Sequence, residues 1–130
     1  MLRKKSIVLA PIVFSILLAS CGQSANDPAR TVETYLGALV EKDASRLSSL
    51  SCADWEAMAL LELDSLQAVE TRLEGLTCST TAEETDGTFS VDCTGKLLAT
   101  YNSEDQEIDL SSNTYLVIEQ GGEFLVCGYR

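Results

Sequence analysis

Cysteine is the residue type with the most chemistry to offer in this chain of 130 residues, and histidine is absent. Without histidine, a Ser-His-Asp triad, a Cys-His dyad and a His-ligated zinc site are all excluded. No two cysteines have the CxxC spacing, so neither a zinc ribbon nor a thioredoxin-type redox site is indicated. The cysteines are therefore candidates for disulfides or for covalent modification. They are Cys21, Cys52, Cys78, Cys93 and Cys127.

The last four cysteines are an even set, which is typical of an exported domain with two disulfides. Four cysteines allow three connectivities, and buried free thiols are the alternative. If a hairpin turn is centred on residues 85–86, Cys78 and Cys93 lie directly opposite each other on neighbouring strands. Cys52 and Cys127 are then left to pair. A slip of one residue in this register would undo the first pairing.

The first cysteine ends a leader that has the features of an export signal. Residues 3–5 are basic, and residues 7–18 are apolar except for one proline and one serine. This run is too short to span a bilayer, which takes about 20 apolar residues. A basic start, a short apolar run and small residues at its end indicate a secretory signal. The tetrapeptide Leu-Ala-Ser-Cys at residues 18–21 also resembles the lipobox of bacterial lipoproteins.

The lipobox resemblance implies that a diacylglycerol is attached to Cys21 and that cleavage removes residues 1–20. Residues 21–27 are then the lipidated cysteine and a short polar tether, and residues 28–130 form a single domain. We expect a protein that is exported and lipid-anchored to the bacterial cell-envelope membrane. An ordinary signal peptide with an incidental cysteine is the alternative.

The chain is strongly acidic, with 9 Lys and Arg against 20 Asp and Glu and a formal net charge of −11. Residues 1–20 hold three of the basic residues and none of the acidic ones, so their removal leaves a net charge of −14. Such a surface repels nucleic-acid phosphates and anionic lipid headgroups. We therefore expect no nucleic-acid partner, and a membrane partner only through the lipid anchor at Cys21. The sequence names no protein or small-molecule partner.

Two acidic clusters, at residues 83–86 and 104–109, are candidates for calcium ligation, because oxygen-rich loops bind this ion. Neither cluster has the spacing of an EF-hand loop, and both fall at expected hairpin turns. Solvated charge is the better interpretation, and we predict no metal site and no cofactor.

The elements that position these residues begin with a helix that follows Asp27. Asp27 is a good N-cap and Pro28 suits the first helical position. Apolar residues then recur on one helical face, at Val32, Tyr35, Leu36, Leu39 and Val40. Lys42 is expected in the last turn, where a cation interacts favourably with the helix dipole.

Two shorter helices are expected next. Asp43 can cap the first of them, with Leu47 and Leu50 facing inward. Asp54 can cap the second, which runs from Trp55 to about residue 63 and has the apolar residues Trp55, Met58, Ala59 and Leu63. Cys52 falls at the joint between these helices.

Strands are predicted to follow the helices. Residues 64–75 fit a helix or a strand, and we favour a strand over 67–82 with a bulge at Gly75. Residues 89–101 alternate between apolar and polar types, as in a strand with one buried face. Another strand is expected over 106–119, with a break near 109–113. Residues 120–123 form a tight turn before a last strand over 124–129.

Helices followed by antiparallel strands predict an α+β domain. We expect three N-terminal helices on one face of a curved sheet of about four strands, in the form of a cone-shaped cup. This order of elements, with the closing stretch YLVIEQGGEFLVCGYR, resembles the nuclear-transport-factor-two-like superfamily and small lipoproteins of unknown function assigned near it. A cystatin-like domain, in which a sheet wraps one helix, is the alternative and fits three helices less well.

The superfamily resemblance implies a pocket between the sheet and the helices. Tyr35, Trp55 and Tyr101 are the candidates for its open end, and Tyr115 and Tyr129 are further aromatic candidates for its lining. Aromatic residues on apolar faces more often belong to the core, which is the alternative for all of them.

Three classes of function are compatible with this sequence. We expect a non-enzymatic binding or interaction module of the cell envelope. A small-ligand-binding cup is the first alternative. An isomerase- or lyase-type enzyme is the second, because some members of the superfamily pair a tyrosine with a carboxylate. No motif places such a pair here, so we assign no catalytic residue.

Overall fold

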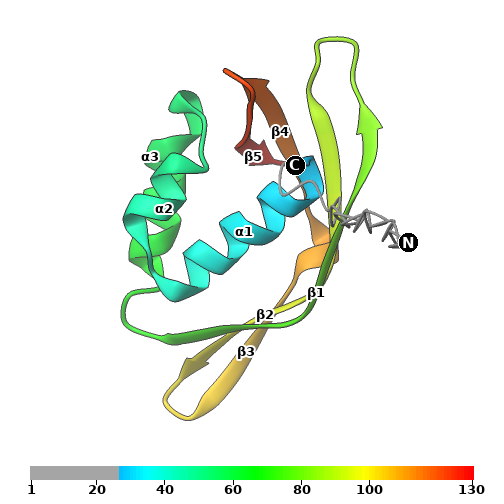
Figure 1. Ribbon diagram of the computed structural model, residues 1–130. Coiled ribbons are helices and arrows are strands. Elements are labelled where there is room, and N and C mark those ends of the chain that lie inside the picture. Colours follow the sequence, from blue (N-terminus) through cyan, green and yellow to red (C-terminus); the bar gives the residue numbers. More distant parts are fainter. Residues whose placement is uncertain (1–26) are drawn as a thin grey trace, which may run out of the picture.

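The computed structural model describes residues 27–130, which form an α+β domain (Figure 1). Three helices lie on one side of a curved antiparallel sheet, so the predicted fold class is confirmed. The leader and Cys21 lie outside the described residues. The helices are α1 (Pro28–Glu41), α2 (Ala44–Ser49) and α3 (Ala53–Ser65). The strands are β1 (Glu70–Glu83), β2 (Phe89–Tyr101), β3 (Glu104–Asp109), β4 (Thr114–Gln120) and β5 (Glu123–Tyr129), with a 3₁₀ turn η1 (Leu110–Ser112) before β4.

Helix α1 begins as its capping residues predict. The Asp27 carboxylate accepts a hydrogen bond from the Arg30 amide at 2.9 Å, and Pro28 occupies the first position. Lys42 lies one residue beyond the helix, in the left-handed conformation with φ of 58°, and its Nζ donates to the Val69 carbonyl. The apolar face of α1 is buried against the sheet, at Val32, Tyr35, Leu36 and Leu39.

Helices α2 and α3 differ in how they begin. Asp43 caps α2 by accepting from the Arg46 amide at 3.1 Å, as predicted. The prediction for α3 was wrong by two residues, because its N-cap is Cys52 and Asp54 lies within the first turn. No side chain caps α3. Its start is fixed by the attachment of Cys52 to β5, a contact between distant segments that capping preferences do not encode.

The sheet has the strand order β1-β2-β4-β5, and β3 also pairs with β2. Residues 96–101 of β2 pair with β3, and residues 89–92 pair with β4. The predicted strand over 106–119 is therefore broken within the expected range and gives five strands rather than four. Asp109 stabilises this break, because its carboxylate accepts from the Ser111 amide at 2.9 Å.

A pair of glycines bends the long β1–β2 ribbon. The register between β1 and β2 shifts between Glu74 and Thr77, so the predicted bulge at Gly75 is confirmed. Gly75 and Gly95 both have positive φ, and a Cβ on Gly95 would lie 2.6 Å from the Gly75 carbonyl oxygen. Only glycine allows this close approach. The bend lets the ribbon curve around α1 (Figure 1). The ambiguous segment 64–75 ends α3, turns, and enters β1 at Glu70.

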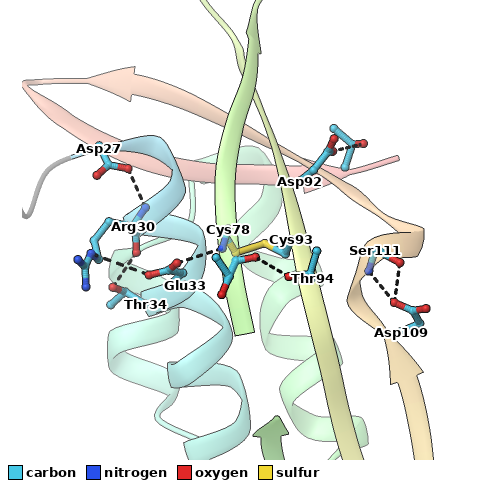
Figure 2. The surroundings of a disulfide bond; sticks show 12 residues. Asp27, Arg30, Glu33, Thr34, Cys78, Asp92, Cys93, Thr94, Asp109 and Ser111 are labelled. Atoms are coloured by element: carbon cyan, nitrogen blue, oxygen red, sulfur yellow. Dashed lines mark hydrogen bonds and ion pairs between the residues drawn. A yellow bond between two sulfur atoms is a disulfide. The ribbon is translucent and has the colours of Figure 1, made fainter. Parts of the chain in front are cut away.

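The first disulfide joins Cys78 to Cys93 across this ribbon, as the assumed register predicted (Figure 2). The two residues are directly paired, with a Cα–Cα distance of 4.1 Å. Glu33 of α1 points toward this bridge and accepts from the Cys78 amide at 3.0 Å. The hydrogen bond between Glu33 and Cys78 therefore links α1 to β1 beside the disulfide.

The second disulfide joins Cys52 to Cys127 with a Cα–Cα distance of 5.3 Å, and this pairing is also confirmed. Two backbone hydrogen bonds lie beside it. The Cys52 amide donates to the Val126 carbonyl at 2.9 Å, and the Val126 amide donates to the Leu50 carbonyl at 2.8 Å. The joint between α2 and α3 is therefore fastened to the last strand.

We predict that the two disulfides stabilise the domain unequally. Their sequence separations are 75 residues for Cys52–Cys127 and 15 for Cys78–Cys93. By the loop-entropy model, replacing both cysteines of the longer loop by alanine lowers the free energy of unfolding by about 4.5 kcal/mol, against about 3 kcal/mol for the shorter loop. Urea unfolding of the two double variants measures the difference. A larger loss for the shorter loop would contradict the prediction.

Candidate functional site

A pocket of about 210 Å³ lies between α3 and the sheet. Every strand except β1 contributes to it, together with α1, α3 and η1. Two other hollows have volumes of about 290 and 420 Å³, and apolar residues are a minority of the lining residues in both, three of seven in the first and one of six in the second. The pocket beside α3 is therefore the best candidate for a binding site. Its lining is Leu36, Leu39, Glu62, Ser65, Leu66, Leu97, Ile108, Leu110, Asn113, Tyr115 and Tyr129.

The pocket combines an apolar floor with a polar rim. Four leucines that are at most 6% exposed form the floor, namely Leu36, Leu39, Leu97 and Leu110. Glu62, Ser65, Asn113 and the hydroxyl groups of Tyr115 and Tyr129 supply the polar atoms among its lining residues. An apolar cavity with a few converging polar groups is typical of ligand sites. The volume lies below the roughly 300 Å³ at which pockets for drug-sized molecules begin, so the occupant must be small.

Glu62 is the charged group of this pocket, and Tyr129 is its partner. The Tyr129 hydroxyl donates to Glu62 Oε1 at 2.6 Å. This bond favours the neutral phenol and raises the pKa of Tyr129 to about 12. Among residues 27–130, no lysine or arginine forms an ion pair with Glu62. The carboxylate therefore keeps an uncompensated negative charge at the pocket mouth.

Aromatic side chains next to the pocket hold Tyr129 in position. Tyr129 makes edge-to-face contacts with Trp55 and Tyr115, with ring centroids 5.5 and 5.7 Å away. Trp55 Nε1 donates to the Tyr35 hydroxyl at 3.0 Å. Such aromatic pairs are each worth about 0.5–1.5 kcal/mol beyond their burial. Burial raises the pKa of Tyr115 to about 12, and it also raises the pKa of Tyr35.

Gly128 lets Trp55 approach the last strand closely. It has φ of 118°, and a Cβ at this position would lie 3.3 Å from Trp55 Cε3. The indole of α3 therefore lies against the backbone of β5. This contact sets the distance between α3 and the sheet at one end of the helix.

The three residues predicted from the sequence to lie at the open end of the cup, Tyr35, Trp55 and Tyr101, lie in different parts of the domain. Tyr35 and Trp55 are brought together, but Tyr35 is only 1% exposed and belongs to the core. Tyr101 is separate from both, because it ends β2 at the β2–β3 turn and is 58% exposed. None of the three lines the pocket, whereas Tyr115 and Tyr129 do.

Sequence reasoning missed Glu62, Ser65 and Asn113. For Glu62 a signal exists, because it lies seven residues after Trp55 on the side of α3 that faces the sheet. A carboxylate on the side of a helix that faces the core is unusual unless it is paired or functional. Asn113 has no comparable signal, since only the break between β3 and β4 brings it to the pocket.

The acidic side chains of both clusters lie on the surface, and none of them lines the pocket. Residues 104–109 form the exposed strand β3, whose Asp105 and Glu107 pair with Arg72 at 3.0 Å and Lys96 at 2.6 Å. Hydrogen bonds from Thr100 and Arg72 lower the pKa of Asp105. Within the described part of the chain, no group of His, Cys, Asp and Glu could hold a metal ion. No helix of residues 27–130 is long and apolar enough to cross a membrane.

The Tyr129–Glu62 hydrogen bond should stabilise the protein in a pH-dependent way. The pKa of Tyr129, about 12, lies above the value near 10 of an unfolded tyrosine. Its contribution is therefore complete below pH ~10 and is lost as the pH rises toward 12. Tyr129→Phe should lower the free energy of unfolding by less than about 1 kcal/mol at pH 8, because the pair is partly exposed.

Urea unfolding of both proteins at pH 8, 10 and 12 measures this difference. Tyr35 and Tyr115 also titrate in this range and interact with Tyr129, so Tyr115→Phe is measured beside Tyr129→Phe as a control for tyrosine ionisation. The difference should shrink toward zero at pH 12. A difference that stays constant across this range would contradict the assigned bond.

The comparisons with known proteins add little to this geometry. No protein-family model and no curated protein matches the sequence. Among solved structures, a chain titled Rd1NTF2_05 with five substitutions aligns with a TM-score of 0.45 and 10% sequence identity. The alignment covers 76% of this chain and 90% of that chain. A likeness at this level carries no argument about function.

Proposed function

We propose that this protein is an exported lipoprotein, anchored to the cell-envelope membrane through Cys21, whose domain is a non-enzymatic binding module. Its binding site is the pocket beside α3. The observation that carries the proposal is the pairing of an apolar floor with the uncompensated Glu62 carboxylate at the rim. An enclosed apolar floor and a single charged group recognise a small amphiphilic group.

The cysteines support export. All four cysteines of the described domain are in disulfides, and such bonds persist in oxidising compartments outside the cytosol. The leader with its Leu-Ala-Ser-Cys tetrapeptide supplies a route to such a compartment.

The short length of the tether keeps the domain close to the membrane. Six residues, 22–27, separate the anchoring cysteine from the start of α1. Fully extended, they reach roughly 20 Å. The net charge of −14 after residue 20 repels anionic headgroups, so the lipid holds the domain while its surface stays available to other partners.

A second candidate function is an isomerase-type activity, which the Tyr129–Glu62 pair favours. A carboxylate base and a tyrosine donor in one pocket are the groups that such chemistry uses. Here the two groups bind each other at a partly exposed rim, and Tyr129 is 40% exposed. Water reaches both groups, whereas this chemistry depends on a site that excludes water. Binding is therefore the better-supported function.

Replacing Cys21 by alanine should remove the anchor, because only the thiol accepts the diacylglycerol. We expect the wild-type protein in the detergent phase of a Triton X-114 partition and the Cys21→Ala protein in the aqueous phase or unprocessed. Ser24→Ala, three residues further on, is the matched control and should behave as the wild type. A cleaved Cys21→Ala protein that stays in the detergent phase would refute the anchor.

The pocket should bind a small apolar alcohol. We expect 1-pentanol to cause saturable chemical-shift changes at the amides of Leu97, Leu110 and Tyr115, with a Kd in the millimolar range expected of so few contacting atoms. Ser65→Phe places a ring over the pocket from an exposed rim position and should abolish these changes. Absence of saturable changes in the wild-type protein would refute the pocket as a binding site.

A further inference from the structure

We infer that the pocket receives a lysine or arginine side chain of a partner protein, with the alkyl stem on the leucine floor and the cationic head at Glu62. This inference rests on the proposed binding function and names the chemistry of the partner. Three independent features of the described residues carry it: the charge at the mouth, the size and polarity of the floor, and the exposed apolar residues around the mouth.

The charge at the mouth selects a cation. Glu62 accepts one hydrogen bond, on Oε1 from Tyr129, and no bond to its Oε2 is present within residues 27–130. No basic side chain of this part of the chain neutralises it. The ring of Tyr129 lies beside the same carboxylate and adds an aromatic surface of the kind that attracts cations. The acidic domain around it also speeds the approach of a basic partner.

The size and polarity of the floor select one long side chain. A pocket of about 210 Å³ lies below the range for whole metabolites of drug size. Lysine and arginine carry an apolar stem of three or four methylene groups below their charged head. The stem matches the four buried leucines, and the head remains at the rim next to Glu62. An acidic or uncharged polar side chain would lose one of these two matches.

The residues around the mouth point to a protein rather than a free amine. Of the five large apolar side chains exposed in the described domain, two line the pocket and two lie on α3 close to its lining residues. Ile108 and Tyr129 line it, and Met58 and Leu61 lie one helical turn before Glu62 and Ser65 on α3. Exposed apolar side chains gathered around a pocket are typical of an interaction surface. A free amine would leave them in water.

Two peptides test the cation. N-acetyl-Leu-Lys-Leu-amide presents the side chain between apolar neighbours, and the same peptide with norleucine replaces the charge by a methyl group. NMR titration of the full chain in detergent micelles should show the lysine peptide binding about tenfold more tightly, with shifts at Tyr129 and Leu97. Glu62→Gln should reduce this ratio to nearly one. Asp64→Asn removes the same charge from an exposed position of α3 and should preserve the ratio.

A rim variant tests the protein partner. Leu61→Ser should weaken the lysine peptide about fivefold and leave the binding of n-pentylammonium unchanged, because only the peptide reaches the rim. If the peptide binds no more tightly than n-pentylammonium, the pocket serves a free amine and the inference is overturned.

Equal affinities for the lysine and norleucine peptides, or equal effects of Glu62→Gln and Asp64→Asn, would also overturn it. In that case binding of 1-pentanol, which carries no charge, would still support the proposed function. Loss of 1-pentanol binding as well would refute both.

Discussion

The attachment of Cys52 to the last strand is the constraint on which the rest of this structure depends. A disulfide to Cys127 and the two backbone hydrogen bonds around Val126 fix the start of α3 against β5. From this point α3 packs beside β5 and α1, and Trp55 lies on the backbone of Gly128. Because the helix is held at its start, its later residue Glu62 meets Tyr129, and a pocket remains between helix and sheet.

The same constraint explains why the pocket is only partly filled. Helix α1 fills the concave face of the sheet with its own apolar residues, among them Tyr35 and Leu36. Helix α3 places Ala59 and Leu63 against this core, but Glu62 and Ser65 on the adjacent side of the helix are too polar to complete it. The domain therefore buries less apolar surface next to α3. The disulfides offset this loss of stability by restricting the unfolded chain. A site of this kind needs rigid support from outside, and the cross-links provide it.

Much of the fold follows from local rules, whereas the site does not. The N-caps at Asp27 and Asp43, the bulge at Gly75 and the alternation over residues 89–101 depend on neighbouring residues, and each was predicted correctly. The disulfides followed from the register of one hairpin. The start of α3 and the pocket depend on contacts between residues more than 60 positions apart, such as Glu62 and Tyr129. Periodicity carries no information about such contacts, and so Tyr101 was placed at an opening it does not reach.

The most direct test of this account is an intermolecular NOE experiment on the full chain in detergent micelles with bound N-acetyl-Leu-Lys-Leu-amide. We expect contacts from the lysine ε-methylene protons to the Tyr129 ring and from its β- and γ-methylene protons to the methyl groups of Leu97 and Leu110. Contacts to Tyr101, or to the hollow around Thr34 and Phe124, would contradict it, because the peptide would then bind at a place that α3 does not form.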